Sequence, residues 1–488
     1  MADHGHKFMA PNIKSETIDI KHDHERRSAN YKPNIWNYDY LVSLSNKCTG
    51  EKYEREAQKL RMEVKSMFYE ANDQPAKLEL IDSIQKLGIA YLFEEEINEA
   101  LEAITSTKIN NAGTGVNLYF SALCFRLLRQ HGHDVSLDLF TNFLDKTGGF
   151  KRSIFNNIEG MLELYECSHL ALEGEDELCE AKLLCNGRLR EIRIDRDLAK
   201  KVEHALDLPL HWRVPWFDTK WQINMCAAQE GKSPNLVDLA KFNFNMIQAT
   251  HQQELINLSR WDFNETQQLP EYMKICFKAL YDTANDTAYE IEAEKDCRNV
   301  LPHLKQAWAE FCNALFTEAK WYNQGYTATL QEYLSNAWIS SSGPVISTHI
   351  LLSISDDKKV EVESFSEKNQ ELVYCSSMIV RLCNDLGTSS AELERGDSPS
   401  SILCYMREGN ASEEMARKHI RSLIIQTWER INKIRGNQPP SGRTFVNLIT
   451  NVARVAQRIY QYGDGFGDQD RETKAEILSL LIEPLALG

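Results

Sequence analysis

Apolar residues recur at intervals of three and four along most of this chain, and this spacing gives a helix one apolar face. The pattern is almost continuous from about residue 50 to residue 210, as in segments 51–71 and 77–104. These segments carry no strand signal, and they pair across short breaks without a fixed repeat length. The periodicity therefore predicts an all-α protein and argues against a repeat scaffold.

The chain has 488 residues, more than one hydrophobic core usually organises, so we expect two helical domains. Residues 1–25 are polar, rich in His and without an apolar period, which predicts a flexible tail. We assign an N-terminal helical domain to residues 26–214 and a second helical domain to residues 215–488. In the second domain, the apolar spacing of segment 234–260 predicts one long amphipathic helix.

Twelve cysteines are scattered along the chain without a CxxC pair. Several lie in apolar helical patterns, among them Cys276, Cys312 and Cys383, and this favours reduced thiols in the cores of an intracellular protein. No run approaches about eighteen apolar residues, so no membrane span is expected. The formal net charge of −16 argues against a nucleic-acid groove and an anionic membrane surface. Metal ions would have to offset this charge if an anionic substrate binds.

The N-terminal segment also bears on the compartment. Its first 25 residues contain five acidic side chains, whereas organellar transit peptides are rich in Arg and Ser and poor in acids. This composition favours a cytoplasmic protein, and the plastid is the alternative if the start is truncated.

A row of oxygen-bearing side chains is expected on one late helix. If segment 371–397 is helical, Asn384, Thr388 and Glu392 fall one turn apart, and Arg381 lies one turn earlier on nearly the same side. Amide, hydroxyl and carboxylate oxygens suit Mg²⁺, which usually shares its ligand shell with a phosphate. The planar fork of Arg381 suits a phosphate oxygen. Such a row is most often a solvated helix face, but the apolar neighbours at 378–382 favour a binding site.

The run from Asn384 to Glu392, NDLGTSSAE, resembles the second metal motif of plant class I terpene synthases. In that family the first, fifth and ninth positions hold one Mg²⁺ of a trinuclear cluster. The resemblance implies that Asn384, Thr388 and Glu392 are metal ligands and that the cofactor is Mg²⁺, or Mn²⁺. It further implies that Asp385 supports the ligands from behind and that Arg381 contacts the diphosphate.

Two other segments carry the same resemblance. Arg26 and Arg27, followed after eight residues by Trp36, match the tandem-arginine element of plant monoterpene synthases. That element lies over the mouth of the active site and is associated with isomerising the substrate before ring closure. Segment 453–470 resembles the loop that closes the site, where Tyr460 and Asp464 match positions near the carbocation. The resemblance thus implies a lid and two further candidate catalytic residues.

A helix break is expected in the sequence AWISSSGP, near Gly343 and Pro344. A break frees backbone carbonyls, and we expect it to turn residues Ser340, Ser341 and Ser342 toward a cavity where partial negative charge steadies a carbocation. The competing interpretation is an aromatic core interrupted by a proline.

The chain departs from the family pattern after Trp261. The family has on the order of seventy further residues there, enough for two or three helices at ~1.5 Å per residue. That block carries the aspartate-rich DDxxD helix that binds the other two Mg²⁺ ions. Asp282 and Asp286 lie four apart, but the family has an ordinary polar helix at that place. We therefore expect an internal deletion near residues 260–262.

The resemblance implies a Mg²⁺-dependent lyase that ionises geranyl diphosphate and cyclises it to a monoterpene, with activity strongly reduced by the missing segment. Two alternatives stay open. One is a sesquiterpene synthase acting on farnesyl diphosphate, and the other is a non-catalytic isoform that binds diphosphate, Mg²⁺ or a full-length synthase. The expected partner is a prenyl diphosphate and no nucleic acid, and the expected assembly is a monomer or a weak homodimer. In plant members the N-terminal domain supports the second domain and does no chemistry.

Overall fold

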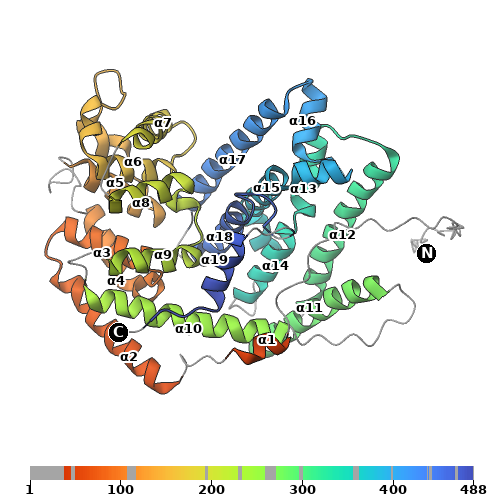
Figure 1. Cartoon of the computed structure of the whole chain (residues 1–488), viewed down its shortest axis with the longest axis horizontal. Helices are drawn as coiled ribbons and strands as arrows, with labels where there is room; N and C mark the ends of the chain where they lie inside the picture. The colour runs from red at the N-terminus through yellow and green to blue at the C-terminus, as the bar shows by residue number, and fades with distance from the viewer. Residues whose placement is uncertain are drawn as a thin grey trace, which may run out of the picture.

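The architecture is helical throughout the part of the chain that the computed structural model describes (Figure 1). The described residues are 38–44, 50–106, 117–192, 196–228, 233–258, 271–295, 300–354, 362–396, 399–436, 438, 442–465, 467 and 471–486. Within these ranges the β pairing consists of one isolated bridge between Leu144 and Phe150. The all-α prediction is confirmed.

Three of the expectations fall outside the described residues. These are the flexible tail at 1–25, the lid element formed by Arg26, Arg27 and Trp36, and the join near residues 260–262. They stay predictions.

The N-terminal half stacks short helices around an apolar core. The helices are α1 (Tyr38–Ser43), α2 (Glu51–Glu70), α3 (Gln74–Lys86), α4 (Glu94–Ser106), α5 (Leu118–Gln130), α6 (Ile158–Ser168), α7 (Asp176–Glu191) and α8 (Arg196–Asp207). Helix α5 lies at the centre, and Phe125 and Leu128 on it are fully buried. Segment 137–143, which the apolar spacing predicted as part of a helix pair, is a 3-10 helix (η4, Leu137–Phe143), and Arg152–Asn156 forms another.

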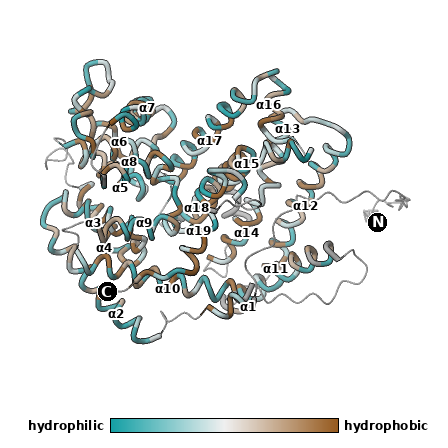
Figure 2. Tube along the Cα trace, viewed as in Figure 1, coloured by the Kyte–Doolittle hydropathy of each residue, from teal (hydrophilic) through white to brown (hydrophobic). Residues whose placement is uncertain are grey.

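The C-terminal half is a bundle around one long helix. Its helices are α9 (Pro215–Ala227), α10 (Pro234–Leu258), α11 (Glu271–Lys295), α12 (Leu301–Gln324), α13 (Leu330–Ser340), α14 (Gly343–Ile354), α15 (Val362–Arg395), α16 (Ser401–Gly409), α17 (Glu413–Gly436), α18 (Arg443–Ile459) and α19 (Arg471–Leu481). Helix α15 packs against α13, α14, α17 and α18. Figure 2 shows apolar and polar residues interleaved along helices such as α10, α12 and α17, as expected when one face is buried.

The two halves share residues at their seam. Ile223 of α9 and Phe244 of α10 belong to the same buried cluster as the N-terminal helices, and so does Leu480 of α19. Pro215 begins α9, so the predicted boundary at 214/215 falls at a helix start. The domain division itself stays a prediction, because the N-terminal core extends into α9 and α10.

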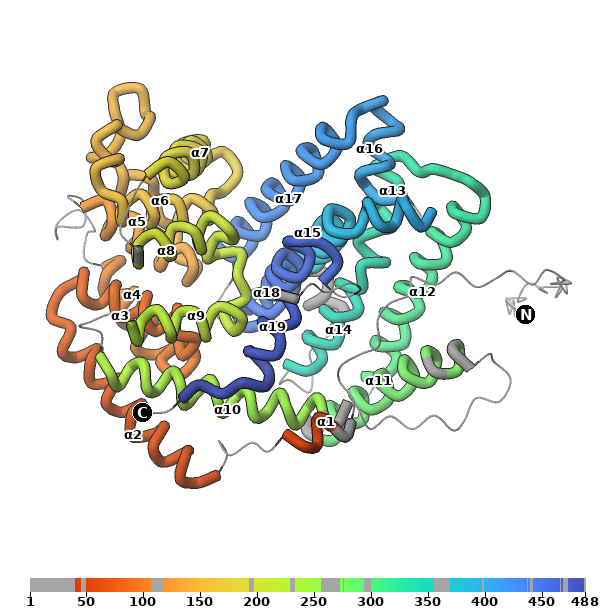
Figure 3. Tube along the Cα trace, in the orientation of Figure 1, coloured from red at the N-terminus to blue at the C-terminus, as the bar shows by residue number. Residues whose placement is uncertain are grey.

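The last described segment runs back along α10 toward the N-terminal helices (Figure 3). Polar side chains on α10 bind its backbone. The amide of Asn245 both donates to the carbonyl of Leu485 and accepts from its N–H, at 2.9 and 2.8 Å. Gln248 donates to the carbonyl of Leu480 at 2.7 Å, and Gln252 donates to that of Leu481 at 2.8 Å. This polar face of α10 therefore fixes the C-terminal segment onto the N-terminal core.

The prediction for two cysteines is wrong. Cys276 on α11 and Cys312 on α12 are exposed, whereas Cys383 on α15 is buried as expected. Their helix faces also expose large apolar side chains, including Phe277 at 53% and Phe316 at 57%. The apolar spacing was recognised correctly, but no described segment covers these faces. None of the helices in the described ranges is long and apolar enough to cross a membrane.

Candidate active site

The break between α13 and α14 sets the geometry beside α15. The backbone of Ser342 adopts a φ of 66°, and α14 restarts at Gly343. A Cβ at Gly343 would lie 2.1 Å from Oγ of Ser377 on α15, so only glycine allows the two helices to approach this closely. The predicted helix break near Gly343 is confirmed, and it places the end of α13 against α15.

Arg381 of α15 is held by that helix end. Its Nε donates to the carbonyl of Ala337 at 3.2 Å, and its Nη2 donates to Oγ of Ser340 at 3.0 Å. Its Nη1 donates to Oδ1 of Asn384 at 3.1 Å. Burial opposes the charge and lowers its pKa, but the nearby Tyr333 and Asp385 raise it, and the net pKa lies above its usual value. Arg381 is therefore a permanent cation fixed in one orientation.

Asp385 faces the protein interior. Its Oδ1 accepts the hydroxyl proton of Tyr333 at 3.0 Å, and its Oδ2 accepts the backbone N–H of Ser401 at 2.9 Å. Ser401 begins α16, so Asp385 satisfies an N–H that the helix itself leaves unpaired. Asp385 also lies 3.5 Å from Arg381. It connects α13, α15 and α16 and lies 1% exposed.

The row of oxygen atoms lies on the same helix. Oγ1 of Thr388 lies 2.8 Å from Oε1 of Glu392 and 2.9 Å from the carbonyl of Asn384. Thr388 is buried, whereas Asn384 and Glu392 are half-buried. The helical spacing thus brings the three expected ligands onto one face, and that face is not turned to bulk solvent.

The segment after α18 lies against this face. Tyr460 directly follows the last residue of α18, and its side chain is hydrogen-bonded to that of Asn384. Burial raises the pKa of Tyr460 to about 12, and the negative charge of Asp464 adds to the rise. Asp464 accepts the backbone N–H of Gly467 at 2.9 Å. A Cβ at Gly387 would lie 2.8 Å from the carbonyl oxygen of Gly463, so the loop rests directly on α15.

The oxygen donors on this face fit a metal ion that takes its remaining ligands from outside the protein. Asn384, Thr388 and Glu392 offer one amide, one hydroxyl and one carboxylate oxygen, all hard donors of the kind that Mg²⁺ takes. Among the described residues, no group of three or more His, Cys, Asp or Glu side chains is arranged to hold a metal. One carboxylate supplies little charge, so an ion at these oxygens requires further anionic ligands such as phosphate.

The structure brings most of the predicted residues together. Arg381, Asn384 and Tyr460 are joined by hydrogen bonds, and Ser340 joins them through Arg381. The hydroxyl of Ser341 is used locally, donating to the carbonyl of Trp338 at 2.7 Å. Asp282, set aside as a ligand, is paired with Lys278 at 2.9 Å.

Sequence reasoning missed two partners of this site. Tyr333 on α13 binds Asp385, and Glu318 on α12 accepts a hydrogen bond from Ser340. Both residues lie at ordinary helical positions far from Arg381 in sequence, and no spacing signal marks either of them.

Comparisons with known proteins identify the family. The chain matches the family model "Terpene synthase, N-terminal domain" over residues 35–206. It matches the model "Terpene synthase family, metal binding domain" over residues 250–430. It is 42% identical to the alpha-farnesene synthase of Ricinus communis over 542 aligned residues, which cover 95% of this chain and 96% of that protein.

Solved structures agree with this result. The fold is similar to that of limonene synthase with 2-fluorolinalyl diphosphate, with a TM-score of 0.87 and 32% identity over 95% of this chain and all of that one. It is also similar to isoprene synthase from Populus x canescens in complex with three Mg²⁺ ions and dimethylallyl-S-thiolodiphosphate, with a TM-score of 0.81 and 33% identity. That match covers 93% of this chain and 99% of the poplar chain. The chain belongs to the plant terpene synthase family.

Proposed function

We propose that this chain binds a prenyl diphosphate together with Mg²⁺, or Mn²⁺, on the inner face of α15 and ionises it as a terpene synthase. The observation that carries this proposal is the contact of Arg381 with Asn384, which sets a fixed guanidinium beside an oxygen row. The similarity to a synthase complexed with three Mg²⁺ ions and a diphosphate analogue supports the same site.

Each side chain has a defined task in this proposal. Asn384, Thr388 and Glu392 would hold the metal ion. When bound, the ion stabilises the negative charge of a departing diphosphate as a Lewis acid. The planar guanidinium of Arg381 offers donors in the geometry that phosphate oxygens accept. Asp385, buried behind the row, fixes Arg381 without facing the substrate.

The residues around the metal ligands would protect the carbocation that remains. Tyr460 and the loop to Asp464 lie against α15 and would keep water away from it. The aromatic face of Tyr460 is available to stabilise positive charge. Ser341, Ser342 and Gly343 at the helix break would shape the wall of this pocket.

The proposal includes the loss of the segment that carries the aspartate-rich motif. The sequence holds a single Asp-Asp pair, at 356–357, and Lys follows it directly. The alignment with the Ricinus enzyme covers 542 positions, more than the 488 residues of this chain, so that relative has residues without a counterpart here. The uncovered faces of α11 and α12, with Phe277 and Phe316 exposed, support a missing packing partner.

Such a loss would lower the turnover strongly. Removing one preorganised electrostatic donor from an active site costs roughly 3–4 kcal/mol, and each ~1.36 kcal/mol is a tenfold change in rate. The loss of two metal ions should exceed this cost. We therefore expect a rate at least about a thousandfold below that of a relative with the complete segment.

Geranyl diphosphate is the proposed substrate, and a monoterpene is the proposed product. The match to the tandem-arginine element at Arg26 and Arg27 and the similarity to limonene synthase favour this choice. The identity to a farnesene synthase favours farnesyl diphosphate, which is the second candidate substrate.

The second candidate function is a non-catalytic isoform that binds Mg²⁺ and diphosphate or associates with a full-length synthase. The presence of a single carboxylate in the oxygen row favours it, because one metal site alone gives little stabilisation of the leaving group. Size-exclusion chromatography with and without a full-length relative tests the association. Without that relative, a monomer or a weak homodimer is expected.

One experiment separates the two functions. The purified chain is incubated with geranyl and farnesyl diphosphate in the presence of Mg²⁺, and volatile products and ligand binding are measured in parallel. A monoterpene from geranyl diphosphate supports the synthase. Binding that requires Mg²⁺ without any product supports the non-catalytic isoform.

Matched variants test the site itself. The double variant Asn384→Ala and Glu392→Ala should lose both product and Mg²⁺-dependent binding. Glu394→Ala serves as the control, because Glu394 is exposed on the same helix. Unchanged turnover in the double variant would refute the site assignment.

The compartment is also a proposal, and it has two forms. The acidic composition of the first 25 residues favours the cytoplasm, and the plastid is the alternative. Immunoblotting of fractionated leaf cells for the native protein distinguishes them, since a plastid protein would be recovered with isolated chloroplasts.

A further inference from the structure

A cavity lies between the two halves of the molecule, apart from the oxygen row. Its volume is about 510 Å³, and its walls come from α3, the turn after α5, and helices α17 and α18. Six of the residues that line it are Lys or Arg, whereas two are carboxylates, Glu94 and Asp218. This balance is opposite to that of the whole chain, with its formal net charge of −16.

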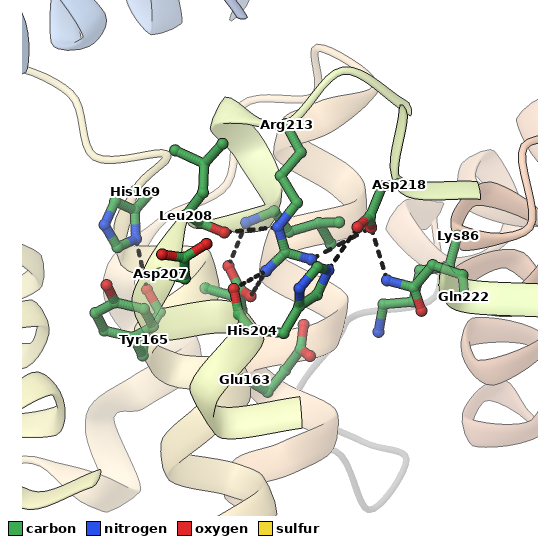
Figure 4. Close-up of polar contacts among 12 residues, drawn as sticks. Lys86, Glu163, Tyr165, His169, His204, Asp207, Leu208, Arg213, Asp218 and Gln222 are labelled. Atoms are coloured by element: carbon green, nitrogen blue, oxygen red, sulfur yellow. Dashed lines mark hydrogen bonds and ion pairs between the residues drawn. The ribbon is translucent and has the colours of Figure 1, made fainter. Parts of the chain in front are cut away.

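On the N-terminal wall the charges are already paired. Figure 4 shows Arg213 with Asp218, and the Nη1 of Arg213 lies 3.2 Å from Oδ2 of that carboxylate. Asp218 also accepts from His204 at 2.6 Å and from Gln222 at 2.7 Å. Arg126 on the same wall is paired with Asp82 and Glu163. Each arginine on this wall therefore has a carboxylate partner, and the wall offers no unpaired positive charge to a ligand.

On the opposite wall the arginines are unpaired. Arg435 of α17 contacts neutral oxygens, with Nη1 3.2 Å from Oγ1 of Thr450 and Nη2 3.5 Å from the carbonyl of Gln130. Arg454 of α18 donates to the carbonyl of His211 and to Oδ1 of Asn451, both at 2.8 Å. Among the residues that the structure describes, no carboxylate forms an ion pair with either arginine.

A third arginine adds to this wall. Arg443 begins α18, is half-buried, and has its Nη2 3.7 Å from the position that a Cβ would take at Gly132. It too lacks an ion pair within the described ranges. The turn at Gly132, with a φ of 76°, therefore brings the end of α5 close to Arg443.

The pKa values of groups on this wall reflect the absence of anionic partners. Burial lowers the pKa of Arg435 to about 10. Burial, together with the charge of Arg435, lowers the pKa of Arg454 to about 9. Burial and the charge of Arg443 also lower the pKa of His131, to about 4. Buried cations without anionic partners cost free energy, and a bound anion would offset that cost.

We propose that this cavity is a binding site for a phosphate-bearing anion, held by Arg435, Arg443 and Arg454. Guanidinium groups recognise phosphate oxygens through their planar fork of donors, and an arginine from α17 and two from α18 line this one cavity. Two sources share this chemistry, inorganic diphosphate and the diphosphate group of a prenyl ester. The site does not include Arg381 or the oxygen row.

Calorimetric titration of the full chain with inorganic diphosphate in EDTA tests the proposal. EDTA removes the divalent ions that the proposed site on α15 requires, so binding under these conditions reports on the cavity. We expect saturable binding with one diphosphate per chain and a rise in the thermal midpoint. A parallel titration with geranyl diphosphate identifies the source. Equal affinity for this prenyl ester shows that the cavity also admits the prenyl group, whereas weaker binding assigns the site to inorganic diphosphate.

A charge-reversal variant and a matched control make the test specific. Arg443→Glu should weaken the diphosphate affinity at least about tenfold, because it replaces a donor with a carboxylate. Arg421→Glu changes the net charge equally on an exposed position of α17 and should leave the affinity unchanged. Undetectable binding in EDTA by the wild-type chain, or equal affinities of the two variants, would overturn the proposal. Neither outcome depends on turnover at α15.

Discussion

The hydroxyl of Tyr333 donates to Oδ1 of Asp385 at 3.0 Å, and both groups are buried. Asp385 and its neighbour Asn384 therefore have different roles on α15. Asn384 lies on the face that carries the oxygen row, whereas Asp385 lies on the face that joins three helices. The helix thus divides a run of polar residues into a face that carries the oxygen row and a face that packs against other helices.

Replacing Asp385 should destabilise the bundle. In Asp385→Ala the hydroxyl of Tyr333 and the N–H of Ser401 both lose their acceptor. A buried polar group left unsatisfied costs about 1–3 kcal/mol, so two such groups predict a loss of about 2–6 kcal/mol in unfolding free energy. Urea denaturation measures it, with the exposed Glu394→Ala as control. An equal midpoint for both variants would contradict the contacts.

Adding one carbon atom at Gly387 should displace the loop after α18. The Cβ of Gly387→Ala would lie 2.8 Å from the carbonyl oxygen of Gly463 and 3.2 Å from that of Tyr460. We expect faster proteolytic cleavage within residues 460–465, measured by mass spectrometry. Gly187→Ala is the control, because nothing lies within 4 Å of its Cβ and alanine favours the helix by up to about 1 kcal/mol.

The seam between the halves depends on Asn432. Its amide donates to the carbonyls of His169 and Ala171 at 3.0 and 3.1 Å and accepts from His211 at 2.7 Å. Asn432→Leu keeps the number and branching of the side-chain heavy atoms but removes all three bonds, and we expect a loss of about 2 kcal/mol or more in unfolding free energy. Thermal unfolding measures it against Gln426→Leu, an exposed site on the same helix. Equal midpoints would show that the seam does not need this amide.

Acid should weaken the fold through His169. Burial lowers the pKa of His169 to about 3, below the value of about 6.5 in an unfolded chain. The unfolded state therefore binds a proton that the folded state excludes, and the stability present above pH ~6.5 falls as the pH drops toward the folded value.

The variant His169→Phe checks this pH dependence. It keeps an aromatic ring beside Tyr165 and Trp212 but cannot bind a proton. The loss of unfolding free energy between pH 7 and pH 5 should shrink by up to about 2 kcal/mol in the variant. An unchanged loss, measured by urea denaturation at both pH values, would mean that His169 is also protonated in the folded chain.

Inserting the segment that we propose is missing should change both the exposed apolar surface and the turnover rate. A chain that carries the corresponding segment of the Ricinus enzyme near residue 261 should bury Phe277 and Phe316 and bind less hydrophobic dye. Turnover of geranyl or farnesyl diphosphate should rise at least about a thousandfold. An insertion of equal length made of Gly and Ser is the control. Equal rates for the two insertions would argue against a role for metal ligands in the inserted segment.

The sequence allowed the helical fold and the oxygen row to be predicted for the same reason. Both are local, because positions three and four apart on one helix must lie together. Partners from other helices were not predictable in this way. Tyr333, Glu318 and the N–H of Ser401 reach the site only because α12, α13 and α16 pack beside α15.

The wrong predictions arise because an apolar period describes one helix at a time. An apolar period shows that a helix has an apolar face, but it does not show whether another segment covers that face. Cys276 and Cys312 were therefore placed in a core and are exposed. The 3-10 helix at Leu137–Phe143 is too short for its period to be distinguished from that of an α-helix.

The contact of α10 with residues 480–485 has a consequence for biosynthesis. Leu480 fills a gap in a core formed by residues that the ribosome made several hundred positions earlier. The nascent N-terminal helices must therefore wait, with that gap open, until almost the whole chain has been translated. During that interval the apolar surface that Leu480 covers in the folded chain is exposed to water.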